Sequence, residues 1–193
     1  FGDDDAFVPL GIEGRRVGVG PVEAVPGPIG AVVREVAGLV ADVQRRVQLD
    51  HLHPAQDVGA VGLAGSATYS SGAFAVTGSG ADVWDTADGF RFVYVTNSGD
   101  CTLVARVTAL QNIDPWSKAG VMIRSSLASN APNAFIAVTP GNGVTFQYRT
   151  ITNGTCGFAN TVGLTAPYWV RLVRSGSTFT GYRSLDGITW TQQ

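Results

Sequence analysis

The stretch DPWSKAGVMIRSSL, residues Asp114–Leu127, has the period-two pattern of a β-strand. Successive side chains of a strand point to opposite faces, so Ala119, Val121 and Ile123 would all point toward one buried face. The opposite face is neither apolar nor plainly solvated, because it carries Trp116, Lys118, Gly120, Met122 and Arg124. The pattern predicts a strand with a core on one side and, on the other, either a binding surface or a solvated sheet face.

The composition is typical of a turn-rich, secreted all-β protein, because the 193 residues include 25 Gly and only 15% are charged. A net charge of −2 without a basic stripe predicts no nucleic-acid partner. No apolar run reaches the length of a bilayer span, so we expect no membrane insertion. The chain begins with Phe1 rather than Met, and we expect it to be a piece of a longer exported polypeptide.

Residues 1–55 differ in character from the rest and are expected to form an N-terminal extension. All three glutamates, Glu13, Glu23 and Glu35, lie here, together with the proline-rich segment Gly20–Gly30. Residues 31–49 place their valines and leucine on one helical stripe, which predicts a helix, although β-branched valine lowers its helix propensity. We favour a linker helix; the alternatives are a docking or oligomerisation element, or a stretch that does not natively belong with the rest.

From Gln56 onward, short alternating runs are separated by Gly, Ser, Asn and Asp, as in an antiparallel β-sandwich. Glycines in Pro140–Gly143 and Ser175–Ser177 predict two tight hairpins. Aromatic residues at period two would supply the core: Phe90, Phe92 and Tyr94, then Phe146 and Tyr148. The predicted strands are Thr68–Tyr69, Ala73–Thr77, Phe90–Thr96, Thr102–Leu110, Ala119–Ser125, Phe135–Thr139, Val144–Thr150, Trp169–Arg174, Thr178–Arg183 and Thr189–Thr191.

Several segments together resemble bacterial extracellular modules of the concanavalin A-like lectin and glucanase superfamily. They are DVGAVGLAGSATYSSGAFAVTGSGADVW (Asp57–Trp84), TADGFRFVY (Thr86–Tyr94), GDCTLVARVTALQNIDPWSKAGVMIRSSL (Gly99–Leu127), NAFIAVTPGNGVTFQYR (Asn133–Arg149) and YWVRLVRSGSTFTGYRSLDGITW (Tyr168–Trp190). The resemblance implies an antiparallel jelly-roll sandwich over residues 56–193. It also implies an accessory module in a large secreted or cell-surface protein, beside other domains of the same parent chain.

The chain departs from this pattern in two places. Further strands are expected after the SLDGITW hairpin, which would leave an unpaired strand edge here. A small residue such as glycine is expected where Cys101 stands. Cys101 and Cys156 are either one disulfide or two separate thiols.

Hydrolysis of a glycoside needs two carboxyl groups that flank the scissile bond. In the hydrolases of the superfamily these are paired glutamates, and residues 56–193 contain no glutamate. We therefore expect no enzyme activity and keep glycoside hydrolysis as a third alternative. His51 and His53 lie outside the resembling region, and a lone H-x-H is weak evidence for a metal. Asp82, Asp85 and Asp88 offer a loop site for Ca²⁺, although aspartate beside glycine also shapes turns.

The face opposite Ala119, Val121 and Ile123 is the preferred candidate site. Guanidinium groups, an amide and a Trp, either Trp116 or Trp84, would bind the hydroxyl or carboxylate groups of a sugar and stack on its ring. The candidate ligand-binding residues are Arg106, Trp116, Lys118, Met122, Arg124, Gln147, Arg149 and Arg171. The sequence thus favours a non-catalytic, carbohydrate-binding module for a polysaccharide or cell-wall glycan. The alternative is a structural or adhesive spacer whose long side chains only solvate the sheet.

Overall fold

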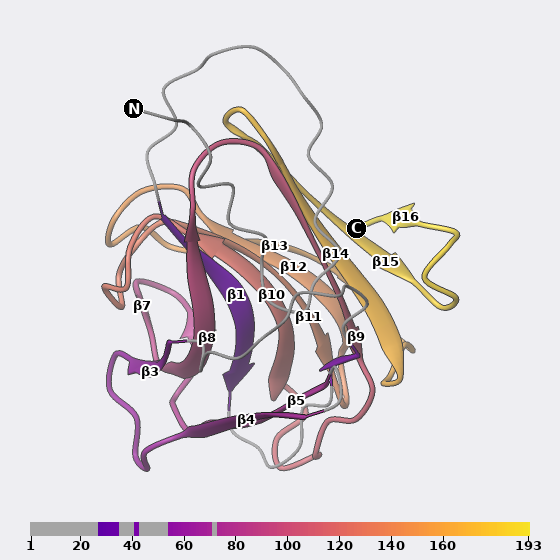
Figure 1. The fold of residues 1–193 in the computed structure, drawn as a ribbon, viewed down its shortest axis with the longest axis horizontal. Helices are drawn as coiled ribbons and strands as arrows, with labels where there is room; N and C mark the ends of the chain where they lie inside the picture. Colours follow the sequence, from indigo (N-terminus) through magenta and orange to yellow (C-terminus); the bar gives the residue numbers. More distant parts are fainter. Residues whose placement is uncertain (1–26, 35–40, 43–53, 71–72) are drawn as a thin grey trace.

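The computed structural model describes residues 27–34, 41–42, 54–70 and 73–193, and every regular element within these ranges is a β-strand (Figure 1). The strands form two seven-stranded antiparallel sheets and a small two-stranded sheet. In spatial order, the first sheet contains β13 (Gly157–Thr161), β12 (Gly143–Arg149), β11 (Asn133–Thr139), β10 (Lys118–Arg124), β1 (Gly27–Arg34), β8 (Phe90–Asn97) and β3 (Ala55–Val58).

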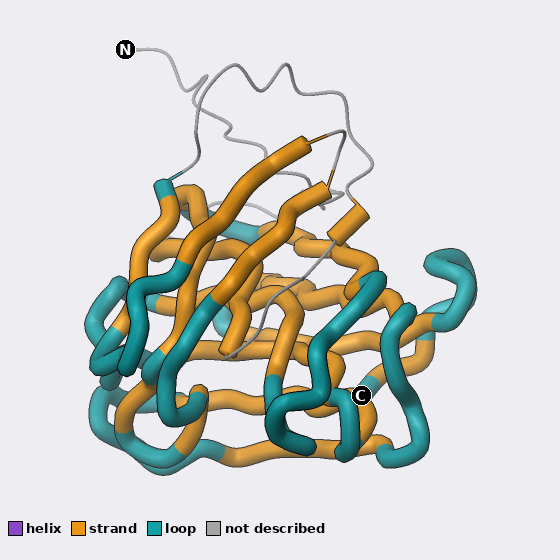
Figure 2. Tube along the Cα trace, turned by 90° about the horizontal axis from the view of Figure 1, so that it is seen from below, coloured by secondary structure: helices purple, strands orange, loops and turns teal. Residues whose placement is uncertain are grey.

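The second sheet contains, in the same manner, β16 (Thr191–Gln192), β15 (Thr178–Ser184), β14 (Tyr168–Ser175), β9 (Cys101–Val107), β2 (Ala41–Asp42), β5 (Ala73–Thr77) and β4 (Ser66–Ser70). The small sheet pairs β6 (Val83–Trp84) with β7 (Ala87–Asp88). Figure 2 shows that the loops gather around the ends of the strands. The all-β, antiparallel class predicted from the sequence is therefore confirmed.

The larger apolar core joins the two sheets. Val121 and Ile136 of the first sheet and Leu103 and Leu172 of the second are fully buried in one cluster. Burying a Val, Leu or Ile side chain stabilises the fold by about 1.5–3 kcal/mol. The predicted inward face of the strand at Asp114–Leu127 is therefore correct, since Ala119, Val121 and Ile123 all belong to this core.

Both predicted hairpins form. Thr139 pairs with Gly143 across the β11–β12 turn, and Ser175 pairs with Thr178 across the β14–β15 turn. Gly143 has a φ of 85°, and a Cβ atom added there would lie 1.9 Å from the carbonyl oxygen of Thr161 in the next strand. Only glycine fits both the positive φ and this close approach.

The predicted strands correspond to β4, β5, β8, β9, β10, β11, β12, β14, β15 and β16, with shifts at their ends. The largest shift is at β9, which ends at Val107 rather than at the predicted Leu110. The sequence missed β3, β6, β7 and β13, in addition to β1 and β2. β13 reads GFANT, which lacks the alternation of apolar and polar residues that marks a half-buried strand.

The predicted aromatic core is divided. Phe90 and Phe92 are fully buried, but they lie on the other side of the first sheet. Tyr94 packs beside them, and Phe146 packs against the core between the sheets. Tyr148 is 41% exposed, so its assignment to the core is wrong. It lies near the end of β12, beside the edge strand β13.

The helix predicted over residues 31–49 is wrong where the structure describes this stretch. Residues 31–34 belong to β1, which lies between β8 and β10, and residues 41–42 form β2. A valine-rich segment suits a strand between two other strands, because β-branched residues favour extended backbone. Residues 35–40 and 43–49 lie outside the described residues, as do His51 and His53. The boundary between an extension and a module near residue 56 stays a prediction.

In the described part of the chain, no helix is long and apolar enough to cross a membrane.

Candidate functional site

The row predicted to face outward from β10 and β12 is covered. The exposed fractions are 1% for Lys118, 0% for Met122, 2% for Arg124, 2% for Gln147 and 1% for Arg149. The prediction of an accessible, guanidinium-lined patch is therefore wrong. Lys118 and Arg149 bind the loop that carries β6 and β7, and Arg124 binds the loop that follows β10.

A second apolar core explains why this face is closed. Met122 and Phe135 of the sheet pack with Val58 and with Val83 of β6. Phe90 completes the cluster, and the guanidinium carbon of Arg124 lies 5.1 Å from its ring centroid. The sheet is thus buried on both faces at β10 and β11. Alternation along one strand shows which side chains share a face, but it does not show whether a distant loop covers that face.

Asp88 is the centre of the charges on this covered face. Arg149 donates two hydrogen bonds to its carboxylate, from Nη2 to Oδ1 at 2.6 Å and from Nη1 to Oδ2 at 2.9 Å. Arg124 Nη1 lies 3.2 Å from Oδ2, and Asn133 Nδ2 donates to the same oxygen at 3.2 Å. The side chains of Asp88, Arg124 and Arg149 are all fully buried. One carboxylate therefore holds three strands, β10, β11 and β12, and the covering loop together.

The two arginines respond differently to this environment. Burial lowers the pKa of Arg124, and the charge and hydrogen bond of Asp88 offset only part of that effect. Burial also acts to lower the pKa of Arg149, but its hydrogen bonds to Asp88 and the charge of Asp88 outweigh burial and raise the pKa. Arg149 further donates to the carbonyl groups of Trp84 and Ala131. The bidentate pair between Arg149 and Asp88 is thus the main ionic contact of the covering loop.

Asp82, Asp85 and Asp88, for which calcium binding and turn formation were the two alternatives, do not form a metal site: the described residues contain no group of three His, Cys, Asp or Glu side chains able to hold a metal. Asp82 makes a short ion pair with Lys118 and accepts the amide of Val83 at 2.7 Å. Asp88 is occupied by the two arginines. Buried cations therefore take the place that a Ca²⁺ ion would need.

Of the two alternatives for the cysteines, the structure has the separate thiols, since Cys101 and Cys156 are both free. Cys101 is buried on β9, and burial raises its pKa to about 11. Cys156 is half-buried, and its Sγ lies 3.5 Å from the carbonyl oxygen of Asp85. Burial raises the pKa of Cys156 as well, against the opposing charge of Arg149.

Trp116 and Trp84, the two candidates for stacking on a sugar, have different neighbours. Trp116 is 36% exposed, and Lys118 Nζ lies 5.6 Å from its ring centroid. Trp84 belongs to β6, where it packs edge-to-face on Phe158 with ring centroids 5.3 Å apart. Trp116 is thus exposed, whereas Trp84 is half-buried.

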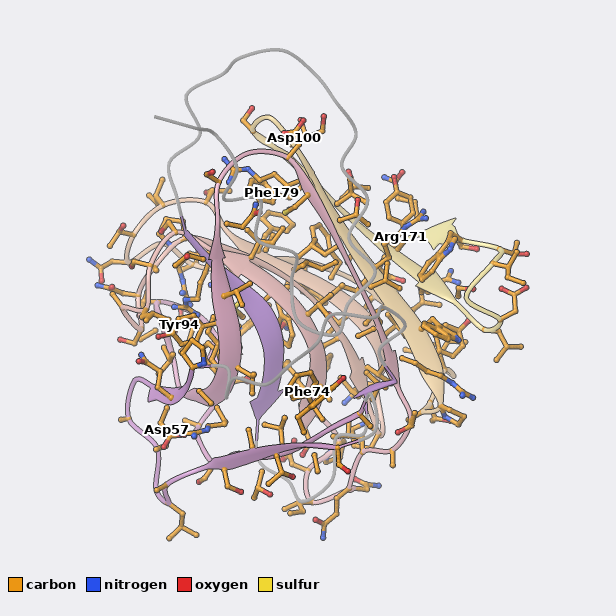
Figure 3. All side chains as sticks on the ribbon, viewed as in Figure 1. Asp57, Phe74, Tyr94, Asp100, Arg171 and Phe179 are labelled. Carbon is orange, nitrogen blue, oxygen red and sulfur yellow. The ribbon has the colours of Figure 1, made fainter. Side chains whose placement is uncertain are left out.

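Arg106 and Arg171, the remaining two predicted ligand-binding residues, lie on the second sheet. Val170 and Leu172 of β14 are buried in the core between the sheets, so the alternation of the strand directs Trp169 and Arg171 to the outer face; part of the Trp169 side chain also packs against that core. Arg106 of β9 is the register partner of Trp169, and Tyr182 of β15 is the register partner of Arg171. Figure 3 shows Arg171 on the side of β14 near the C-terminal strands.

These side chains form a surface with aromatic and cationic groups. We call it the aromatic–arginine face, and it consists of Arg106, Trp169, Arg171, Tyr182 and Trp190. The guanidinium carbon of Arg171 lies 4.3 Å from the ring centroid of Tyr182 and 4.4 Å from that of Trp190. That of Arg106 lies 6.0 Å from the Trp169 ring. All five side chains are half-buried, so each has a covered part and an accessible part.

The arginines of this face retain unused hydrogen-bonding capacity. Nε of Arg106 and Nε of Arg171 are buried and have no hydrogen-bond partner. Burial lowers the pKa of Arg171, opposed by Tyr182. A guanidinium held flat between aromatic rings presents its remaining donors in a fixed plane. The face can therefore supply planar donors and ring surfaces side by side.

Sequence reasoning included Arg106 and Arg171 but missed Trp169, Tyr182 and Trp190. A signal for two of them was available. The hairpin at Ser175–Ser177 sets the register that places residue 171 opposite residue 182, and period two places residue 169 on the same face as residue 171. Trp190 lies in the loop before β16, where periodicity gives no direction.

Comparison of the chain with protein-family models, curated proteins and solved structures found no match.

Proposed function

We propose that the protein is a non-catalytic, carbohydrate-binding accessory module and that the aromatic–arginine face is its binding surface. The observation that carries the proposal is the position of Arg171 between Tyr182 and Trp190 on the outer face of a sheet. The ligand is a polysaccharide or cell-wall glycan, bound reversibly, with no bond made or broken.

The chemistry of sugars matches this surface. A pyranose ring has apolar C–H faces that pack on aromatic rings, and its hydroxyl groups accept hydrogen bonds from guanidinium donors. A row of such groups along neighbouring strands suits a linear glycan chain better than a single sugar. The contacts of Arg171 with Tyr182 and Trp190 lower the entropy lost on binding, because they restrict its side chain before the ligand arrives.

The jelly-roll sandwich and the secreted or cell-surface setting belong to the same proposal. The shared core between two antiparallel sheets supports a concanavalin A-like arrangement. The glycine-rich, weakly charged composition supports an exported protein, and the resemblance to concanavalin A-like modules implies a bacterial protein with further domains in the parent chain.

The alternative is a structural or adhesive spacer without affinity for glycans. The burial of Arg124 and Arg149 favours this alternative, because the row expected to bind serves instead to fasten a loop. Glycoside hydrolysis is third, since residues 54–70 and 73–193 contain no glutamate from which to build a carboxyl pair.

Affinity electrophoresis in gels that contain neutral or acidic polysaccharides tests the proposal. At least one polysaccharide should retard the protein, and Arg171→Gln or Tyr182→Ala should abolish the retardation. Arg183→Gln is the matched control, because Arg183 lies on the same strand and contacts Gln193 rather than the aromatic–arginine face. Retardation that is equal in all variants would contradict this assignment, and no retardation by any polysaccharide would favour the spacer.

A further inference from the structure

A cavity of about 480 Å³ lies at the end of the molecule where β14 turns into β15. One wall belongs to the first sheet, through Ile123, Ala134, Phe146 and Tyr148, and the other includes Arg174 and Phe179. Figure 3 shows Phe179 and Asp100 at this end. The volume falls within the range of about 300–1,000 Å³ that is typical of small-molecule sites. The cavity is separate from the aromatic–arginine face.

Arg174 is the unusual residue of this cavity. It follows Val170 and Leu172 at period two, and these two side chains are fully buried in the core between the sheets. Its register partners are Cys101 on one side and Phe179 on the other, and both of these side chains belong to or pack against that core. An arginine therefore continues an inward-facing row of otherwise apolar residues.

The charge of Arg174 has no acidic partner among the described residues. Its Nε donates to the carbonyl oxygen of Gly176 at 3.1 Å, and its guanidinium carbon lies 5.7 Å from the ring centroid of Phe179. Asp100 accepts the amide of Gly176 at 2.6 Å. No described carboxylate lies within ion-pair distance of the Arg174 guanidinium.

The other two arginines that line the cavity cannot serve the same role. Arg124 and Arg149 extend to the opposite side of the first sheet, where their guanidinium groups bind Asp88. The cavity thus combines apolar walls with one cation at its edge. Ser177 and Thr150, which also line it, add polar atoms near the opening.

We infer that this cavity binds an amphiphile with an unbranched hydrocarbon chain and a carboxylate head. The chain lies between Ile123, Phe146 and Phe179, and the carboxylate accepts hydrogen bonds from the terminal nitrogens of Arg174. Charge complementarity selects the carboxylate, because a cationic head would be repelled and a neutral head would leave the guanidinium unpaired. This inference does not depend on glycan binding.

Isothermal titration calorimetry with decanoate, decanol and decylammonium, each below its aggregation concentration, tests the inference on the whole chain. Decanoate should bind, and decylammonium should not. Arg174→Gln should weaken decanoate binding about tenfold or more, the loss expected for a hydrogen bond to a charged group. Ala134→Leu should abolish binding by filling the cavity, and Arg183→Gln should leave it unchanged, since Arg183 does not line the cavity.

Chemical denaturation shows whether each variant folds. If Ala134→Leu does not fold, NMR titration of the wild-type protein with decanoate replaces this variant. Decanoate should then change the amide chemical shifts of Ala134 and Phe179. The inference is overturned if decanoate does not bind, if decylammonium binds equally well, or if Arg174→Gln leaves the affinity unchanged. If the wild-type protein binds a glycan but not decanoate, the inference about this cavity is overturned and the proposed function is not.

Discussion

The guanidinium of Arg171 lies between the rings of Tyr182 and Trp190, at 4.3 and 4.4 Å from guanidinium carbon to ring centroid. Each such contact contributes about 0.5–1 kcal/mol at accessible sites. Arg171→Ala should therefore lower the free energy of unfolding in urea by about 1–2 kcal/mol. Arg171→Lys should lower the free energy of unfolding by a smaller amount than Arg171→Ala. The lysine ammonium keeps the positive charge near the rings, although it cannot stack on them as a guanidinium does. Equal stability of all three proteins would contradict the stacked arrangement.

Removing the charge of Asp88 should be costly, because two buried guanidinium groups depend on it. Breaking a buried ion pair from one side typically destabilises a protein by about 3–5 kcal/mol. Asp88→Asn should show a loss of this order in urea denaturation. Asp85→Asn is the control, since Asp85 is exposed, contributes its backbone carbonyl to Arg149, and has a φ of 50°, which asparagine tolerates. A stability of Asp88→Asn close to that of the control would contradict the network.

The two thiols should differ in reactivity. Burial raises the pKa of Cys101 to about 11, and the side chain is only 7% exposed, so neither thiolate nor access is available in the folded protein. The pKa of Cys156 is raised too, but this side chain is half-buried. At pH 8, Ellman's reagent should modify Cys156 faster by about an order of magnitude or more. Comparison of the Cys101→Ala and Cys156→Ala variants assigns the two rates, and equal rates would refute the burial of Cys101.

Asp186 should make the stability of the fold depend on pH in the acidic range. Its carboxylate accepts the amides of Ile188 and Thr189, each at 2.8 Å, and these bonds hold its pKa well below the ordinary value of 3.8. A pKa that is lower in the folded state gives a contribution that is complete above the ordinary value and is lost as the pH falls below it. Asp186→Asn keeps an oxygen acceptor but removes the charge.

Thermal unfolding of the wild type and of Asp186→Asn should therefore differ most near neutral pH. The difference should narrow as the pH falls from about 4 toward the depressed pKa of the folded state. Added salt should reduce the difference at neutral pH, because the carboxylate is exposed. A difference that is constant over this range would show that the charge of Asp186 contributes nothing.

Much of the fold could be predicted because it depends on local patterns. Alternation identified β10 and its inward face, and glycines identified the two hairpins. The failures have a common cause in contacts between distant segments. The pattern of residues 31–34 predicts a helix, because the sequence does not show that β8 and β10 lie on either side of this segment.

The candidate site shows the same limit more sharply. The sequence grouped Lys118, Met122 and Arg124 correctly on one face. A loop from an earlier part of the chain, which carries Asp82, Val83 and Asp88, covers that face. Arg171 was proposed as part of the same patch and instead lies on the other sheet. A charged row beside an apolar one can therefore indicate an ionic contact with a loop as well as a binding surface.

The most direct test of the central claim observes the four tryptophans separately. The indole N–H signals of Trp84, Trp116, Trp169 and Trp190 can be followed by NMR while an oligosaccharide of the retained polysaccharide is added. The aromatic–arginine face predicts that the signals of Trp169 and Trp190 shift with saturation, while those of Trp84 and Trp116 stay in place. Shifts confined to Trp84 and Trp116, or no shift at any of the four, would contradict the claim.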